Sequence, residues 1–409
     1  MLRISVANKA IEAYEHVIGL AGIEEIYSLA NKLRNCQVVH VNATSFGGGV
    51  AEILHTLVPL TRSVGINAEW YTIEAPQEFF NVTKLFHNTL QGADTPIEEH
   101  QWKIYEKYCQ QNIEQIDFNA DFVVIHDPQP AAMKQFLKKT QGKWIWRCHI
   151  DLSTPNVAVW RRFSQYLKGY DRMIFHLKEY FPEDFASKCV AFPPSIDPLS
   201  EKNKDMSLEE ARKITSNHGI DPDRPLITVV ARFDPWKDLF AAIDVYRIVK
   251  KTVKSVQLAI VSVMASDDPE GWVFFEKVAR YAGLDPDIIF CTNLTGVGNL
   301  QVNAIQRVSS VALHTATKEG FGLVIAEALW KGIPVVARPV GGVKSQITHG
   351  RNGWLSWSVE DLANYVLMLL RDPDMSRKMG QMGRELVKER FLITSNLKSY
   401  LRLFSVLQR

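Results

Sequence analysis

The chain has 409 residues, which is enough for two or three domains with substantial hydrophobic cores. Its 47 lysines and arginines nearly balance 45 aspartates and glutamates, leaving a formal charge of +2, so no charge excess recommends a nucleic acid or an anionic membrane as partner. No apolar run approaches the roughly 20 residues of a membrane span and no signal peptide opens the sequence, so we expect a cytoplasmic protein.

A first glycine-rich loop, residues 47–49, follows a short β-rich run. Residues 37–41 predict a strand, and residues 50–64 predict an apolar-periodic helix. A dinucleotide fingerprint would need a third glycine where Glu52 stands, and a phosphate-binding P-loop would need Lys-Ser or Lys-Thr after the glycines. Neither motif is present. Consecutive glycines still let the backbone approach a phosphate or a sugar, an interpretation that we weigh equally with an ordinary flexible loop.

Two further predicted strands end in polar residues. The strand over residues 121–126 is followed by Asp127, and the strand over residues 143–150 carries His149 near its end. In parallel α/β sheets, ligands bind beyond the carboxyl ends of strands, so these side chains carry weight. Turn chemistry explains Asp127 equally well, and a lone histidine is more often a core or surface residue. The position of His149 beside Arg147 and Asp151 strengthens the functional interpretation there.

A proline-rich and then polar stretch, residues 193–204, marks the predicted linker between two domains. The N-terminal domain then spans residues 1–195 and the C-terminal domain spans residues 196–389. We expect a final helix, at about residues 390–409, to pack back on the first domain. Strands and helices alternate again after the linker, which indicates a second parallel α/β domain.

Arg232 and Lys237 lie between a strand predicted over residues 226–231 and a helix predicted over residues 238–249. A helix N-terminus already favours anions, so two cations beside it would form a diphosphate site. Such a pair of cations also recurs by chance as ordinary surface charge. Its place in the first strand-helix unit of the second domain strengthens the functional interpretation.

Two carboxylates, Glu319 and Glu327, bracket a turn with two glycines, residues 320–322. An apolar run at residues 311–313 predicts a strand before it, and residues 323–331 have helical spacing. Eight residues of helix span about 12 Å, more than the roughly 5 to 9.5 Å of a hydrolytic carboxylate pair. We therefore disfavour a glycosidase. We favour two carboxylates that bind the two ends of a long polyhydroxyl ligand, such as a sugar nucleotide. The alternative, a helix cap and a solvated surface residue, is outweighed by the glycine turn and the two cations.

Together these motifs resemble the retaining GT-B glycosyltransferases of the glycogen-synthase and sucrose-synthase kind, called family 4. Glu319 and Glu327 match the E-x7-E motif of that family, and Arg232 and Lys237 match its paired diphosphate cations. The resemblance covers the whole chain. It implies an α/β protein of the GT-B class, with two Rossmann-like doubly wound domains that face a central cleft.

The chain is more closely similar to the archaeal and bacterial glycosyltransferring trehalose synthases. The matching stretches are residues 45–52 (SFGGGVAE), 126–130 (HDPQP), 146–151 (WRCHID), 232–237 (RFDPWK) and 267–272 (DDPEGW). This similarity implies retaining transfer of glucose from a nucleoside-diphosphate glucose, such as UDP-glucose or ADP-glucose, to free glucose, forming trehalose. The alternatives are a trehalose phosphorylase, a transferase with another sugar acceptor, or a silent sugar-nucleotide sensor. Ser262 departs from the family pattern, since such enzymes commonly have glycine there.

The resemblance also implies a role for each motif residue. Glu319 would hold the donor sugar and Glu327 the ribose, the two cations would neutralise the departing diphosphate, and His149 would lie under the anomeric carbon. The implied catalytic residues are His149, Arg232, Lys237 and Glu319. The implied donor-binding residues are Gly48, Gly49, Gly320, Phe321, Gly322, Leu323 and Glu327. The weaker acceptor-side candidates are Asp127, Gln129, Arg147 and Asp151.

The implied chemistry requires no cofactor and no metal, because the nucleotide-diphosphate glucose is a substrate whose leaving phosphate can take the acceptor's proton. The five cysteines are isolated, with no C-x-x-C pair, so we expect free thiols rather than disulfides or structural zinc. The expected partners are nucleoside-diphosphate glucose and glucose, with neither nucleic acid nor membrane. A homodimer is compatible with the sequence.

Overall fold

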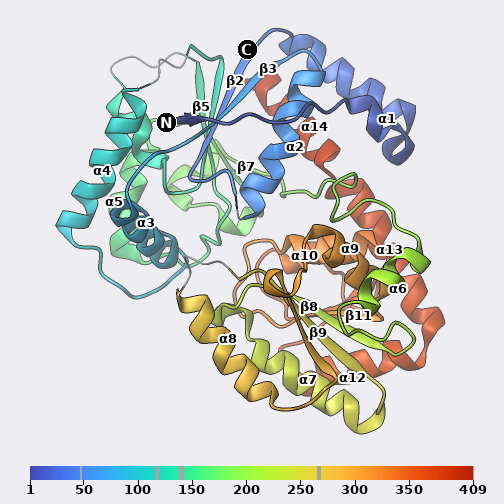
Figure 1. Cartoon of the computed structure of the whole chain (residues 1–409). Helices are drawn as coiled ribbons and strands as arrows, with labels where there is room; N and C mark the ends of the chain where they lie inside the picture. The colour runs from blue at the N-terminus through green and yellow to red at the C-terminus, as the bar shows by residue number, and fades with distance from the viewer. Residues whose placement is uncertain (47, 116–118, 138–141, 265–268, 409) are drawn as a thin grey trace. The chain divides into compact units, whose positions relative to one another are not determined.

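The computed structural model describes residues 1–46, 48–115, 119–137, 142–264 and 269–408. Gly47, Asp267 and Asp268 of the sequence motifs lie outside these residues. The chain forms two compact α/β units, each built around its own sheet (Figure 1). The first unit comprises Met1–Ser195 together with Ile393–Arg409, and the second comprises Ile196–Leu392.

The first unit contains a seven-stranded sheet in the order β1-β3-β2-β4-β5-β6-β7. β1 pairs antiparallel with β3, and all other neighbours are parallel. β4 reads FVVIH and is buried along its whole length, as expected for a central strand of a parallel sheet. The strands are β1 Leu2–Arg3, β2 Gln37–Asn42, β3 Asn67–Thr72, β4 Phe122–His126, β5 Lys143–Arg147, β6 Arg172–Phe175 and β7 Cys189–Ala191.

The C-terminal helix belongs to this first unit. Lys398 Nζ lies 3.0 Å from Glu25 of α1, and the ring of Phe404 stacks on Phe122 of β4 with centroids 4.4 Å apart. The helices of the unit are α1 Glu15–Ala30, α2 Gly49–Ser63, α3 Gln77–Leu90, α4 Glu99–Ile113, α5 Val157–Leu167 and α14 Ile393–Leu407. Its 3-10 helices are η1 Ile11–Tyr14, η2 Asn31–Leu33, η3 Ala131–Phe136, η4 Lys178–Tyr180 and η5 Glu183–Lys188.

The second unit contains a six-stranded, fully parallel sheet in the order β10-β9-β8-β11-β12-β13. Its strands are β8 Leu226–Val230, β9 Gln257–Ser262, β10 Ile288–Thr292, β11 Val311–His314, β12 Val335–Ala337 and β13 Gly353–Leu355. Its helices are α6 Leu208–Ser216, α7 Leu239–Thr252, α8 Pro269–Ala282, α9 Asn299–Val308, α10 Leu323–Trp330, α11 Val343–Gln346, α12 Val359–Arg371 and α13 Pro373–Arg390, with η6 Pro235–Lys237 and η7 Asn293–Thr295.

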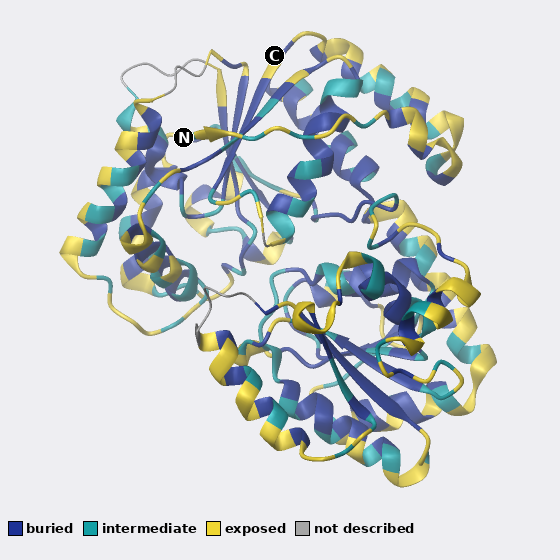
Figure 2. Cartoon of the chain, viewed as in Figure 1, coloured by how far each residue is buried: buried dark blue, intermediate teal, exposed yellow. Residues whose placement is uncertain are grey.

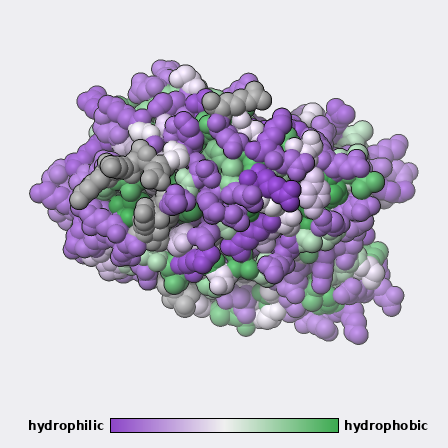
Figure 3. All heavy atoms as spheres, turned by 90° about the horizontal axis from the view of Figure 1, so that it is seen from above, coloured by the Kyte–Doolittle hydropathy of each residue, from purple (hydrophilic) through white to green (hydrophobic). Residues whose placement is uncertain are grey.

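Figure 2 shows the strands of both sheets as mostly buried, while exposed residues gather on the outer faces of helices and in loops. On the face shown in Figure 3, hydrophilic residues dominate and hydrophobic residues form separate small groups between them. Within the described residues, no helix combines the length and the apolar character that crossing a membrane requires. All five cysteines are free, as predicted.

Candidate active site

In the second unit, the loops after β8 and β11 leave neighbouring strands where the strand order reverses. From β8 the chain moves outward to β9 and β10, and then returns to β11 on the other side of β8. In open α/β sheets, ligands bind beyond the carboxyl ends of strands at such a reversal. Because Arg232 and Lys237 follow β8 and Glu319 follows β11, the topology brings the predicted cations and carboxylate to one edge of the sheet.

Lys237 and Glu319 form an ion pair at this edge. Lys237 Nζ lies 2.7 Å from Glu319 Oε2, and the two side chains are only 16% and 15% exposed. The two loops are also tied together through their backbones, since Thr315 Oγ1 donates to Lys237 O at 3.1 Å and Thr317 N donates to Trp236 O at 2.8 Å. The geometry of the pair is therefore set by the loops and not only by two flexible side chains.

The neighbours of Glu319 keep its carboxylate ionised. Burial alone would raise its pKa, but the charge of Lys237 and a hydrogen bond with His314 at 3.1 Å lower the pKa of Glu319 to about 2. An ionised carboxylate only accepts hydrogen bonds, so His314 must carry a proton on Nε2. At neutral pH, Glu319 therefore offers acceptor lone pairs to a ligand that carries hydroxyl groups.

The glycine turn after Glu319 is fixed by the segment that follows β12. Gly342 N donates to Gly320 O at 3.2 Å, and Gln346 Nε2 donates to Phe321 O at 2.6 Å. A Cβ atom on Gly342 would lie 2.5 Å from Phe321 Cα and 2.6 Å from Gly320 O, so only glycine fits at this position. The segment after β12 is therefore the support on which the glycine turn at residues 320–322 rests.

Helix α10 begins directly after this turn. Gly322 is its N-cap residue with φ of 82°, a left-handed conformation that favours glycine, and Leu323 is its first helical residue. Phe321 is buried and packs edge-on against Phe391 with ring centroids 5.4 Å apart. The backbone N–H groups at the start of the helix, with the positive end of the helix dipole, make this end of α10 favourable for anions and hydroxyl oxygens.

Arg338, which the sequence reasoning did not single out, joins the two loops from β12. Its Nη1 donates to Asp238 Oδ2 at 2.6 Å and to Thr315 O at 2.8 Å. Arg338 directly follows β12, which lies beside β11 in the sheet. Its contacts with both loops depend on the strand order, which no local sequence pattern reveals.

Arg232 forms no ion pair with Glu319 among the described residues. Its side chain is 73% exposed, and its ion-pair partner in the described structure is Asp234, 3.7 Å away. A pair this loose and exposed contributes little to stability. Arg232 is therefore free to turn toward a ligand anion at little cost.

Glu327 lies inside α10 and is only 1% exposed. Its Oε1 is 3.2 Å from Lys202 Nζ, while its Oε2 has no hydrogen-bond partner among the described residues. Lys202 falls in the stretch predicted as a linker, yet this part of it is docked on the second unit, since Trp330 Nε1 donates to Asn203 O at 3.1 Å. The sequence reasoning missed this contact between Lys202 and the candidate residue Glu327.

In the first unit, Asp127 and His149 meet at the carboxyl ends of β4 and β5. His149 N donates to Asp127 Oδ1 at 2.8 Å, and Asp127 N donates to Arg147 O at 2.8 Å. Asp127 has φ of 66°, a left-handed conformation that aspartate and asparagine tolerate better than most residues. The structure therefore brings together three of the residues predicted for the acceptor side and for catalysis.

Arg147 is buried without an acidic partner among the described residues. It is 1% exposed, and its guanidinium lies 4.7 Å from the centre of the Phe192 ring. Its Nε and Nη1 make no hydrogen bond with described residues, and burial lowers its pKa. A buried arginine usually has a carboxylate partner. Arg147 has none within ion-pair distance among the described residues, so its positive charge acts on the neighbouring strand ends.

The remaining predicted residues of the first unit lie in the segments that follow β2, β4 and β5. Gly48 is the N-cap residue of α2 and Gly49 is its first residue. Asp151 Oδ1 accepts from Ser153 N at 2.8 Å, which is local turn chemistry. Gln129 Oε1 is buried and has no hydrogen-bond partner among the described residues.

Asp127→Asn should change the pH dependence of stability. Burial raises the pKa of Asp127 to about 7, although the hydrogen bond from His149 N and the charge of Arg147 lower it. The native state thus binds this proton more tightly than the unfolded chain, so the contribution of Asp127 to stability falls as pH rises from about 4 to about 7. Asparagine keeps the acceptor oxygen and tolerates the backbone conformation, but it does not titrate.

We therefore expect Asp127→Asn to be more stable than the parent protein near pH 8, and not near pH 4, in denaturant unfolding followed by fluorescence. Asp151→Asn removes a carboxylate from the same edge and serves as the control. The same stability difference between Asp127→Asn and the parent at both pH values would contradict the raised pKa.

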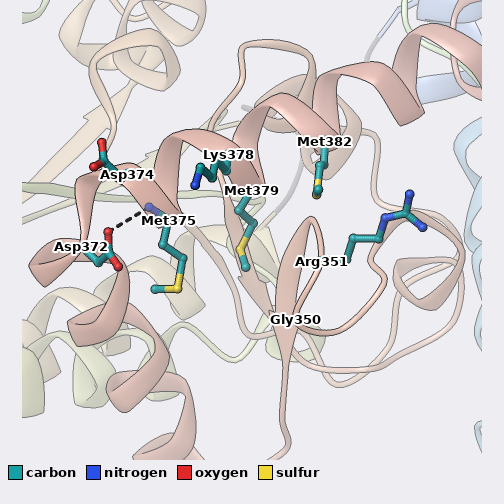
Figure 4. A pocket seen from close by; sticks show the side chains of 8 residues that line it. All are labelled: Gly350, Arg351, Asp372, Asp374, Met375, Lys378, Met379 and Met382. Atoms are coloured by element: carbon teal, nitrogen blue, oxygen red, sulfur yellow. Dashed lines mark hydrogen bonds between the residues drawn. The ribbon is translucent and has the colours of Figure 1, made fainter.

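A surface pocket elsewhere in the second unit contains none of the predicted residues. Figure 4 shows its lining, which comes from α13 and the turn before β13. Its carboxylates already serve the helix, since Asp372 accepts from Met375 N at 2.9 Å and Asp374 pairs with Arg377 at 2.6 Å. Among the described residues, no group of three or more His, Cys, Asp or Glu side chains is arranged to hold a metal ion.

Two protein families match the chain. One, described as trehalose synthase, N-terminal domain, matches residues 40–182, and the other, described as glycosyl transferases group 1, matches residues 210–386. The trehalose synthase of Thermococcus litoralis is 52% identical over 400 residues, which cover 97% of each chain. A trehalose phosphorylase of Pleurotus pulmonarius is 25% identical over 447 residues, which cover 96% of this chain and 60% of that protein.

Among solved structures, a UDP-forming α,α-trehalose-phosphate synthase from Burkholderia xenovorans is similar with a TM-score of 0.71 at 14% identity. The similarity covers 92% of this chain and 100% of that one. At this identity it shows the fold alone. Together with the two parallel sheets, it confirms the predicted α/β GT-B class with two Rossmann-like domains.

Proposed function

The chain belongs to the trehalose synthase family of GT-B glycosyltransferases, and from that premise we propose that it transfers glucose from a nucleoside-diphosphate glucose to free glucose, with retention, to form trehalose. The observation that carries the proposal is the Lys237–Glu319 pair, 2.7 Å apart, where the strand order reverses. A cation and an ionised carboxylate beside a helix N-terminus suit a ligand with a diphosphate at one end and sugar hydroxyls at the other.

In this proposal, each group of the second unit acts on one part of the donor. Glu319 accepts hydrogen bonds from the sugar hydroxyls, and the backbone N–H groups of residues 320–322 lie beside it. Lys237 and Arg232 stabilise the charge that develops on the leaving diphosphate, an effect often worth about 3 to 4 kcal/mol per donor. Glu327 binds the ribose hydroxyls through its oxygen that has no partner among the described residues.

The bond changes balance without a protein nucleophile. The bond from the anomeric carbon to the phosphate oxygen breaks, and the acceptor hydroxyl oxygen bonds to the same face of that carbon. A phosphate oxygen takes the acceptor's proton. His149 of the first unit steadies the sugar as positive charge develops, and Asp127, Gln129, Arg147 and Asp151 are the proposed acceptor-side residues. The scheme needs neither a metal nor a cofactor.

A product assay tests this proposal. UDP-, ADP- and GDP-glucose are each offered with glucose, and trehalose is offered with inorganic phosphate in a parallel reaction. Trehalose plus free nucleoside diphosphate supports the synthase. Glucose 1-phosphate from trehalose and phosphate alone would make the chain a phosphorylase, and nucleotide binding without any turnover would make it a sensor. Silence with glucose but transfer to another sugar would correct the acceptor.

Substitutions at Glu327 should affect the donor more than the acceptor. We expect Glu327→Gln to raise the KM for the nucleotide donor by about tenfold, because it weakens hydrogen bonds to a buried charged acceptor. Lys202→Met should raise the same KM by a smaller factor, since it leaves the carboxylate in place without its partner. The measurement is steady-state kinetics with the donor and glucose varied separately.

Lys331→Met is the matched control, because Lys331 Nζ is buried 3.1 Å from Asn203 Oδ1 beside Lys202. It should reduce stability without changing the KM for the donor. An unchanged KM for the donor in Glu327→Gln would remove the ribose from the list of groups that the site binds, and would favour the phosphorylase alternative.

A further inference from the structure

Three histidines of the first unit form a hydrogen-bonded row, which we call the histidine chain. His40 of β2, His126 of β4 and His149 after β5 come from three neighbouring strands. His40 Nδ1 lies 3.0 Å from His126 Nε2, and His126 Nδ1 lies 3.0 Å from His149 Nε2. The rings of His126 and His149 are stacked, with their planes 19° apart. His149, the histidine proposed for catalysis, is thus the outer member of the histidine chain.

Each N···N contact needs one proton, so the neutral histidine chain has two arrangements. In the first, every member carries its proton on Nδ1 and donates it to Nε2 of the next, which leaves His149 with an Nδ1–H for a ligand. In the second, every proton is on Nε2 and the bonds run the other way. The second arrangement leaves His40 with an Nε2–H that has no hydrogen-bond acceptor among the described residues.

The surroundings of His40 favour the first arrangement. His40 is 1% exposed and meets the edge of Tyr400 at a centroid distance of 5.8 Å. Within the described residues, the only hydrogen bond of its ring runs through Nδ1 to His126. A buried N–H without an acceptor is rarer and more costly than an unsatisfied lone pair. The protons of the histidine chain therefore belong on Nδ1.

The histidine chain is uncharged at neutral pH. Burial lowers the pKa of His40 to about 3. Burial, together with the positive charge of Arg147, lowers the pKa of His126 and of His149 well below the usual range. The ionisable groups that face the histidine chain are Arg147, His176, Asp127 and Tyr400.

We propose that His126, backed by His40, is a positioning residue that holds His149 as a neutral Nδ1–H donor for an oxygen of the sugar substrate. The identity of that substrate rests on the proposed function. An imidazolium would repel the positive charge that develops at the anomeric carbon, whereas a neutral N–H donor binds a hydroxyl oxygen without that repulsion. Without His126, His149 would divide between its two tautomers and offer the donor only part of the time.

The tautomers can be measured directly on the full chain. Histidine labelled with 15N gives long-range 1H–15N correlations that distinguish Nδ1–H, Nε2–H and charged rings, and single substitutions assign each signal. We expect His40, His126 and His149 to be neutral with the proton on Nδ1 near pH 7. The exposed His100 serves as the reference ring. Protons on Nε2 in these three residues, or a charged His149, would overturn the proposal.

Two substitutions at His126 test its effect on catalysis. Asparagine can still donate an N–H to His149 Nε2, whereas leucine cannot. We expect His126→Leu to lower kcat about tenfold and His126→Asn to stay within about threefold of the parent, with the KM for the donor unchanged in both. His100→Leu is the control for loss of a histidine. Equal losses in the Asn and Leu variants would show a packing role only and would overturn the proposal.

The two experiments keep this proposal separate from the proposed function. If the three histidines carry Nδ1–H but the product assay yields no trehalose, the proposed tautomers stand and the proposed substrate is wrong. If trehalose forms but the three histidines carry Nε2–H, the proposed substrate stands and the proposed role of the histidine chain is wrong. Should His126→Leu fail to fold, the spectra of the unsubstituted protein still decide the arrangement.

Discussion

Lys237→Ala should lower kcat by about 100- to 1000-fold while the KM for acceptor glucose stays within about threefold of the parent. In the proposed scheme, the Lys237 cation stabilises charge that appears on the diphosphate only as its bond to the sugar breaks. The effect therefore falls on turnover. In this scheme the acceptor glucose does not contact that charge, so its binding should change little. Release of nucleoside diphosphate, followed over a range of glucose concentrations, measures both parameters.

The loss of Lys237 also leaves Glu319 buried without its cation, which should destabilise the fold by about 3 to 5 kcal/mol. The pKa of Glu319 is lowered from an ordinary value of 4.5 to about 2, so the pair's contribution is complete above about pH 4.5 and is lost as pH falls toward 2. Lys237→Ala/Glu319→Gln should regain part of that stability near pH 7 without regaining turnover.

Lys250→Ala is the matched control, because Lys250 lies 2.6 Å from Asp285 and 3.0 Å from Asp287 in another ion-pair cluster of the same unit. It should cost stability and leave kcat per folded molecule near the parental value. Near-normal kcat in Lys237→Ala would remove Lys237 from the proposed mechanism.

The spacing of the charged motifs was enough to predict where they lie, but not what they touch. The strand, glycine turn and helix around Glu319 follow from local pattern, and so does the strand end that carries Lys237. The contact between these two residues, 82 apart in sequence, depends on β8 and β11 being neighbours. Lys202 had no local signal at all, because the polar stretch around it has the composition of a linker.

The histidine chain shows the same limit. His149 could be singled out by its place at a strand end, but its partners depend on the order β2-β4-β5, which periodicity does not reveal. His40, the inner member, is 86 residues from His126, and it reads in sequence as one polar residue within an apolar strand. Only the sheet shows that its side chain is the end of a hydrogen-bonded row.

Helix α13 was not predicted, and the reason is physical. Its sequence carries Gly380 and Gly383 among charged residues, a pattern that weakens helix prediction. A Cβ on Gly380 would lie 1.8 Å from Gly332 O, so the glycine permits close packing of α13 against the end of α10. Tertiary contact outweighs the poor helix propensity of glycine here.

Gly342→Ala should strongly reduce activity. The new Cβ would lie 2.5 Å from Phe321 Cα and 2.6 Å from Gly320 O, and both of these are backbone atoms that no side-chain rotation can move away. The segment after β12 or the glycine turn must therefore shift. The hydrogen bond from Gly342 N to Gly320 O, 3.2 Å long, would be strained in either case.

We expect Gly342→Ala to lower kcat/KM for the nucleotide donor by about 100-fold, because a displacement of about 1 Å in groups that position a substrate can cost that much. It should also lower the free energy of unfolding by about 1 to 3 kcal/mol, as overpacking of a tight contact does. Gly298→Ala is the matched control, since its Cβ would meet only the Gln301 side chain at 3.4 Å. Steady-state kinetics and denaturant unfolding of the two variants measure these effects. Parental kcat/KM in Gly342→Ala would show that the position of the glycine turn does not determine how the donor is bound.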